Sequence, residues 1–161
     1  MNSLRHRIVR MISGGQTGAD RAALDFAAGN SIDYGGHVPR GRMAEDGRIA
    51  NKYAGLVETS TGDNSERTEL NVINSDATLI VSNGKLTGGS KLTEQFARTH
   101  GKPVLHIDLS GMPFNDAAER SRVWLEAARC KTLNVAGPRA SKDPQIYDNT
   151  YALLRAIFTN K

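Results

Sequence analysis

Three glycine-rich segments each follow a run of apolar, strand-like residues in this chain. They are Gly14-Gly15-Gln16-Thr17-Gly18, Ser82-Asn83-Gly84 running on to Thr87-Gly88-Gly89-Ser90, and Ala136-Gly137-Pro138-Arg139. A strand that passes through a glycine turn into a helix presents the first N–H groups of the helix and the positive end of its dipole, and glycine lets an oxyanion approach the backbone. The pattern predicts an α/β fold with anion-binding loops at its strand ends.

Strand-like and helix-like segments alternate over all 161 residues, which predicts a parallel sheet covered on both faces. We expect a single domain, residues 1–161, with a three-layer, doubly wound Rossmann-like fold and a mostly parallel sheet of five or six strands in the order 3-2-1-4-5-6. That order puts the ligand crevice between the strand ending at Ser13 and the strand ending at Ser82. The expected strands are 7–13, 32–38, 55–59, 77–81, 103–109 and 132–136, and the expected helices are 20–29, 63–74, 90–100, 114–129 and a terminal helix at about 147–158.

Charge and cysteine content narrow the function classes. The net charge of +4 comes from basic residues scattered along the chain, which favours an anionic small ligand over a nucleic-acid surface with its denser basic stripe. No stretch approaches the length of a membrane span, and the single cysteine, Cys130, excludes an internal disulfide and favours a reducing compartment, so we expect a cytoplasmic protein. The four histidines lie far apart, and we expect no structural metal.

The first glycine loop, residues 14–20, matches neither G-x-G-x-x-G nor the lysine-containing phosphate loop, so we interpret it as an analogue of a phosphate loop. Gln16 and Thr17 can donate to a phosphate or a ribose, and Asp20 can cap the helix or hold a ribose hydroxyl. A tight turn with a capping aspartate is the alternative.

The second loop carries two glycines and several hydroxyl groups at the start of a helix, which offers both backbone and side-chain donors to an oxyanion. The alternative is a helix capped by Ser90 without a ligand. The expected binding residues here are Ser82, Gly84, Thr87, Gly88, Gly89, Ser90 and Thr93.

Several charged residues are further candidates. Arg40 and Arg42 can clamp a phosphate from the loop after the second strand, or pair with its carboxylates at the surface. Arg67 is a candidate partner for a phosphate or base, and Glu69 a candidate acid or base, although paired surface charges explain both. Gly137 and Arg139 form either a binding loop after the last strand or a surface turn.

Five separated motifs, read together, resemble the putative molybdenum carrier family. They are residues 12–21, 39–47, 67–72, 87–90 and 133–139. The resemblance implies a Rossmann-like fold similar to the Lonely Guy phosphoribohydrolases and the DNA-processing protein A group, with the molybdenum cofactor or a nucleotide as the bound ligand. Proteins with related folds often associate through the helices that flank the sheet, so the sequence leaves open whether this protein forms a homo-oligomer.

Two functions are compatible with these residues. The first is binding of a phosphorylated nucleotide-like or pterin-like molecule. The second is cleavage of an N-glycosidic bond in a nucleoside monophosphate, with Asp20, Glu69 and Glu94 as candidate catalytic carboxylates. The hydrolase signature P-G-G-x-G-T-x-x-E is incomplete here, because the second glycine step is missing and Glu94 is out of register.

Overall fold

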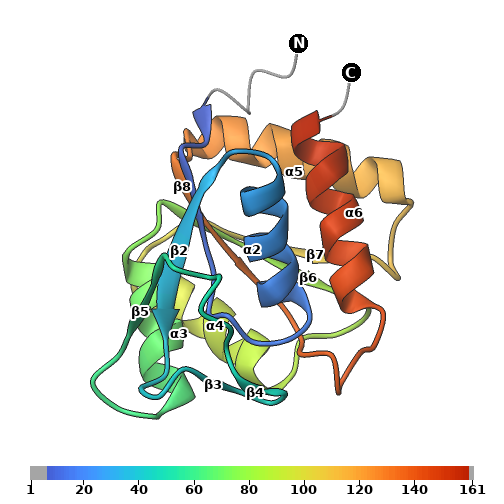
Figure 1. Cartoon of the computed structure of the whole chain (residues 1–161). Coiled ribbons are helices and arrows are strands. Elements are labelled where there is room, and N and C mark those ends of the chain that lie inside the picture. The colour runs from blue at the N-terminus through green and yellow to red at the C-terminus, as the bar shows by residue number, and fades with distance from the viewer. Residues whose placement is uncertain (1–6, 160–161) are drawn as a thin grey trace.

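A six-stranded parallel sheet runs through the centre of the protein (Figure 1). The computed structural model describes residues 7–159. The sheet consists of β1 (Arg10–Ile12), β2 (Asp33–Val38), β5 (Leu56–Glu58), β6 (Ala77–Ser82), β7 (Val104–Asp108) and β8 (Thr132–Ala136). The helices are α2 (Ala19–Gly29), α3 (Asn64–Ile73), α4 (Gly88–Thr99), α5 (Phe114–Ala128) and α6 (Ile146–Thr159). The expected Rossmann-like fold class is confirmed.

The expected strand order is wrong in one respect. The sheet has the order β5-β2-β1-β8-β6-β7, so the last strand lies between the first and the fourth instead of at the edge. Leu133 and Val135 of β8 are fully buried; Leu133 pairs with both β1 and β6, and Val135 pairs with β6. By contrast β7, at the edge, is buried only at alternate positions. Short apolar runs of this kind look alike in sequence whether they are central or peripheral. The consequence is that the loop after β8 lies between the two other glycine loops.

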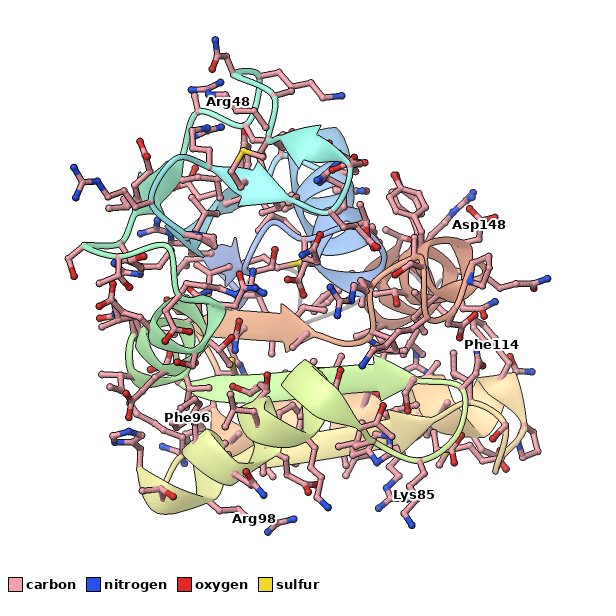
Figure 2. All side chains as sticks on the ribbon, turned by 90° about the horizontal axis from the view of Figure 1, so that it is seen from below. Arg48, Lys85, Phe96, Arg98, Phe114 and Asp148 are labelled. Carbon is pink, nitrogen blue, oxygen red and sulfur yellow. The ribbon has the colours of Figure 1, made fainter. Side chains whose placement is uncertain are left out.

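The helices form two layers. Helices α2, α5 and α6 pack together on one face of the sheet, and α3 and α4 pack together on the other. The small residues along α2 are buried against β1, β2 and β8, while Phe26 packs edge-on to Tyr151 and close to Phe158 of α6. Long charged side chains such as Arg48 and Arg98 project outward from the surface (Figure 2).

Residues 39–54, which lie between the expected strands 32–38 and 55–59, contain a short antiparallel hairpin of β3 (Met43–Ala44) and β4 (Gly47–Arg48). The buried guanidinium of Arg42 holds this segment together, since it donates to the carbonyl oxygens of Ile49, Ala50 and Tyr53. Arg42 is therefore a structural residue of the hairpin.

Within residues 7–159, none of the helices has the length and apolar character needed to cross a membrane.

Candidate functional site

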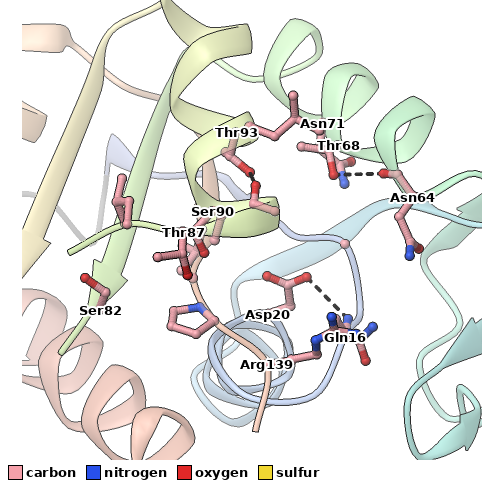
Figure 3. Close-up of a pocket in the computed structure, with 18 of the residues that line it drawn as sticks. Gln16, Asp20, Asn64, Thr68, Asn71, Ser82, Thr87, Ser90, Thr93 and Arg139 are labelled. Atoms are coloured by element: carbon pink, nitrogen blue, oxygen red, sulfur yellow. Dashed lines mark hydrogen bonds between the residues drawn. The ribbon is translucent and has the colours of Figure 1, made fainter. Parts of the chain in front are cut away.

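A cavity of about 250 Å³ opens at the carboxyl ends of the central strands β8 and β6, where the three glycine-rich loops meet (Figure 3). In an open α/β sheet this edge, near the reversal of strand order, is where ligands bind. Many of the residues expected from the sequence line it, namely Gly14, Gln16, Asp20, Arg67, Ser82, Thr87, Gly89, Ser90, Thr93, Gly137 and Arg139.

The remaining candidates are not among the described residues that line the cavity. They are Gly15, Thr17, Gly18, Arg40, Arg42, Gly84, Gly88, Glu69 and Glu94. Glu69 lies 2.8 Å from the ring of His100, and Glu94 pairs with Arg98 at 3.4 Å, both on the outer surface. Of the three candidate catalytic carboxylates, the structure therefore brings only Asp20 into the cavity.

The first wall of the cavity is a close cluster of Gly14, Asp20 and Arg67. Nη1 of Arg67 donates to the carbonyl oxygen of Gly14 at 2.5 Å and lies 3.7 Å from Oδ2 of Asp20, which accepts the N–H of Gln16 at 3.3 Å. A Cβ atom on Gly14 would collide with the guanidinium of Arg67 and the carboxylate of Asp20. The absence of a Cβ at position 14 therefore leaves room for these two side chains, from α2 and α3, to lie side by side over the first loop.

The carboxylate of Asp20 is poorly solvated. Its burial raises the pKa to about 6, even though Arg67 and the N–H of Gln16 favour the ionised form. A carboxyl group that titrates near neutrality in a cavity wall is characteristic of functional sites.

The second wall is the N-terminus of α4. Thr87 precedes the helix, and its side chain makes no capping hydrogen bond in the described chain. Ser90 and Thr93 are buried behind it, and Thr93 donates to the carbonyl oxygen of Gly89. A Cβ on Gly89 would have none of the described atoms within 4 Å, so Gly89 faces open space. The first N–H groups of α4 are thus presented to the cavity without a competing cap.

Basic side chains surround this opening. Arg67, Lys85, Arg139 and Lys142 all line the cavity, and Asp20 is the only acid among the lining residues that the structure describes. Nζ of Lys142 lies so close to Gly88 that a Cβ there would approach it to 2.6 Å. Cations and a helix N-terminus at one opening produce a positive potential that favours an anion.

Sequence reasoning missed Lys85 and Lys142, together with the polar lining residues Asn64, Thr68 and Asn134. Lys85 lies inside the second glycine loop and could have been included. Lys142 follows Arg139 by three residues, but only the path of that loop turns it toward α4.

Hydrogen bonds fix the loop after β8 against the first loop. Oγ1 of Thr17 accepts the N–H of Ala140, and the carboxylate of Glu45 accepts the N–H of Ser141. Hydrogen bonds from the side chain and backbone of Ser141, together with the charge of Arg139, lower the pKa of Glu45. Gln16 joins the same network, since its amide oxygen accepts the N–H groups of Thr17 and Glu45. Thr17 thus positions Arg139.

At the far side of the cavity, the hydroxyl of Ser82 donates to the carbonyl oxygen of Gly84 and lies 2.6 Å from Nε2 of His106. Burial lowers the pKa of His106. Asp108 accepts the N–H of Gly84, which fixes the second loop. Gly84 therefore contributes to the site by shaping the loop.

Cys130 is buried, and its thiol donates to the carbonyl oxygen of Thr132. Burial raises the pKa of this thiol to about 12. Across residues 7–159, no group of three or more His, Cys, Asp or Glu side chains is arranged to hold a metal ion.

Comparison with known proteins places this geometry in a family. A profile described as the circularly permutated YpsA SLOG family matches residues 11–158. The chain is 54% identical to the putative molybdenum carrier protein from Syntrophus aciditrophicus SB, whose crystal structure at 1.45 Å resolution superimposes with a TM-score of 0.92 over 94% of this chain and 95% of that chain.

A second solved structure, (E)-4-hydroxy-3-methyl-but-2-enyl diphosphate reductase, is only 10% identical, with a TM-score of 0.39 over 94% of this chain and 60% of that chain. No curated protein sequence matches the chain.

Proposed function

The chain belongs to the circularly permutated YpsA SLOG family, and from that premise we propose that its cavity binds a phosphorylated small molecule with a nucleotide-like or pterin-like ring. The observation that carries the proposal is the N-terminus of α4, which faces the cavity without a side-chain cap. Four basic residues, Arg67, Lys85, Arg139 and Lys142, line the same cavity. The phosphate would lie at Thr87 to Ser90, where backbone N–H groups, hydroxyls and the helix dipole all favour an oxyanion.

Lys142 and Arg139 support the same assignment. Neither forms an ion pair with a carboxylate within 4 Å among residues 7–159, so both charges are available to a ligand. A guanidinium and an ammonium beside a helix N-terminus neutralise a phosphate dianion better than the backbone alone.

The molybdenum cofactor is one candidate cargo, because the similar Syntrophus protein is named as a molybdenum carrier. This cofactor carries a phosphate and a pterin ring. The described residues offer the metal no cluster of thiolate or imidazole ligands. The protein would therefore hold such a cargo through its phosphate and pterin, with the metal end left to other contacts.

A second function is favoured by the position of Asp20. A carboxylate beside the ribose could stabilise positive charge at the anomeric carbon while the N-glycosidic bond of a nucleoside monophosphate breaks. Incubation with nucleoside monophosphates would then release free base and ribose phosphate, and Asp20→Asn would abolish the release. Unchanged nucleotides after prolonged incubation would leave binding as the function.

The first experiment is mass spectrometry of small molecules released when freshly purified protein is denatured. A nucleotide or pterin phosphate in stoichiometric amount would identify the ligand class. If the protein is purified empty, calorimetric titration with nucleoside monophosphates and a pterin monophosphate would test the same proposal, and the absence of binding by any of them would contradict it.

Substitution of Gly89 tests the phosphate position. The open space around Gly89 accommodates a side chain, and an acidic residue in the first turn of a helix favours the helix. We expect Gly89→Asp to fold normally and to lose phosphate-dependent binding by at least about tenfold, because its carboxylate occupies the anion position. Gly89→Asn is the matched control of equal size without charge. Equal affinity of Gly89→Asp and Gly89→Asn would contradict a phosphate at this helix end.

A further inference from the structure

Asp20 and Arg67 form an acceptor and a donor side by side in the cavity wall. Their side chains are only 10% and 12% exposed, and they come from α2 and α3, which lie on opposite faces of the sheet. Figure 3 shows Asp20 projecting into the space between the Gln16 loop and the first turn of α4. A ligand whose phosphate lies at α4 therefore has Asp20 and Arg67 within the same cavity for its other end.

The pair is held rigidly before any ligand arrives. Nη1 of Arg67 bonds to the carbonyl oxygen of Gly14, and its Nε bonds to Oγ1 of Thr68 at 3.3 Å. The N–H of Gln16 donates to Oδ2 of Asp20, the same carboxylate oxygen that faces Arg67. A fixed acceptor beside a fixed donor reads one arrangement of groups on a ligand and rejects the reversed arrangement.

The complementary arrangement is a ring carbonyl next to a ring N–H. Guanine and pterin share this lactam edge, with an exocyclic amino group beside the N–H. Adenine presents the reverse at the equivalent positions, an amino group next to an unprotonated ring nitrogen. A carboxylate accepts the two N–H groups of a lactam edge, and a guanidinium donates to its carbonyl oxygen.

We propose that Asp20 and Arg67 select the ligand by the lactam edge of a guanine or pterin ring, with Asp20 accepting from the ring N–H and amino groups and Arg67 donating to the carbonyl. The assignment rests on the proposed function of the same cavity. Asp20 and Arg67 are then the residues that determine specificity. The ligand is limited to phosphorylated compounds whose ring carries this lactam edge, a 2-amino-4-oxo pyrimidine.

Ribose hydroxyls are the competing partner for Asp20. Their O–H groups would donate to the carboxylate and their oxygens would accept from the guanidinium, so ribose would satisfy the buried pair without discriminating between bases. A lactam edge also satisfies donor and acceptor together, and it alone predicts a preference between bases, which titration with different monophosphates measures.

The test is calorimetric titration of guanosine, adenosine and xanthosine monophosphates and of a pterin monophosphate, with wild type and Asp20→Asn at pH 7.5 and constant ionic strength. For the wild type we expect guanosine and pterin monophosphates to bind at least about tenfold more tightly than adenosine monophosphate. In Asp20→Asn this preference should be lost. Xanthosine monophosphate should gain affinity, because its second carbonyl accepts the new amide N–H.

A matched control separates specificity from net charge. Asp116→Asn removes the same charge at an exposed position on α5, outside the cavity lining. It should leave every affinity within about twofold of the wild type. A misfolded Asp20→Asn variant would lose affinity for every ligand, so a gain in affinity for xanthosine monophosphate cannot arise from misfolding. Thermal melting of Asp20→Asn and Asp116→Asn checks the stability of both variants.

Two results would overturn the inference while leaving the proposed function intact. One is equal wild-type affinity for guanosine and adenosine monophosphates. The other is an equal loss of both in Asp20→Asn, which would assign Asp20 to the ribose or to catalysis. If no phosphorylated ring compound binds the wild type, and Gly89→Asp behaves as Gly89→Asn does, the proposed function itself fails.

Discussion

The ionised form of Asp20 is disfavoured because its carboxylate is buried, and only Arg67 among the described basic residues lies within 4 Å of it. An ionised side chain in such a place costs stability unless it is fully paired. A buried carboxylate in the wall of this cavity that weakens the fold is consistent with the ligand role proposed above for Asp20.

The pH dependence of stability measures this cost. A pKa raised from 3.8 to about 6 means that the folded state holds the proton more tightly than the unfolded chain. The resulting stabilisation is complete below pH 3.8 and is lost as the pH rises through about 6, a difference of about 3 kcal/mol. We expect Asp20→Asn, which cannot ionise, to be more stable than wild type at pH 7.5 by up to about 3 kcal/mol, and equally stable at pH 3.5.

Urea unfolding at the two pH values checks this expectation. Arg67 and Arg21 are the basic groups that favour the ionised form. If the difference between variant and wild type were the same at both pH values, Asp20 would not be the titrating group.

Single residues of the site were predictable to different degrees. Gly14, Gln16 and Asp20 could be found because a glycine turn after a strand has a local signature. Arg42 was expected either to clamp a phosphate or to pair with carboxylates at the surface, yet it is buried in its hairpin, because three carbonyl oxygens at 49, 50 and 53 fold back onto it. Whether an arginine faces a ligand or its own loop depends on the path of the loop, which has no periodic pattern.

At the scale of elements, α3 shows how a local signal positions Arg67, a candidate binding residue. Asp63 and Glu66 have the spacing of a capping box, and Asp63 caps the helix by accepting the N–H of Ser65. Glu66 departs from the reciprocal arrangement, since it accepts from Thr61 and Ser60 in the preceding loop. The cap and this loop together fix the first turn of the helix, one turn before Arg67 enters the cavity.

Removal of the cap should therefore weaken the helix. We expect Asp63→Ala to lower the free energy of unfolding by about 1 kcal/mol, because an N–H in the first turn loses its acceptor. Asp63→Asn keeps an acceptor and should stay within about 0.5 kcal/mol of wild type. Chemical denaturation of the three proteins measures both, and equal stability of the alanine and asparagine variants would show that the cap contributes nothing.

At the scale of the whole molecule, one carboxylate joins three distant segments. Asp25 of α2 accepts the hydroxyl of Tyr53, from the segment after the hairpin, and the hydroxyl of Tyr147, from α6, each at 2.5 Å. Burial and the hydrogen bond to Asp25 raise the pKa of both tyrosines. The contact holds α6 and the hairpin segment against the same helix that carries Asp20.

A double-mutant cycle tests this joint. Tyr53→Phe and Tyr147→Phe should each lower the free energy of unfolding by about 1 kcal/mol through the lost hydrogen bond. Because both hydroxyls bond to one carboxylate, the double variant should differ from the sum of the single effects by at least about 0.5 kcal/mol. Strict additivity in equilibrium unfolding would show that the two bonds are independent.

The strand order decided how the candidate site is assembled. With β8 between β1 and β6, the loop that carries Arg139 and Lys142 comes between the first two glycine loops. The sequence alone had placed that loop at the sheet edge, reaching toward the site from outside. The choice between a central and an edge position depends on which strand fits between two others, a property of the packed sheet.

The sequence by itself determined the alternation of strands and helices, the fold class and the glycine loops at the strand ends, because hydrophobic periodicity and turn residues act over a few neighbouring positions. The tertiary structure alone decided the position of β8, the pairing of Asp20 with Arg67 and the approach of Lys142 to α4. These contacts join residues dozens of positions apart, and no local pattern records which distant side chain closes a cavity.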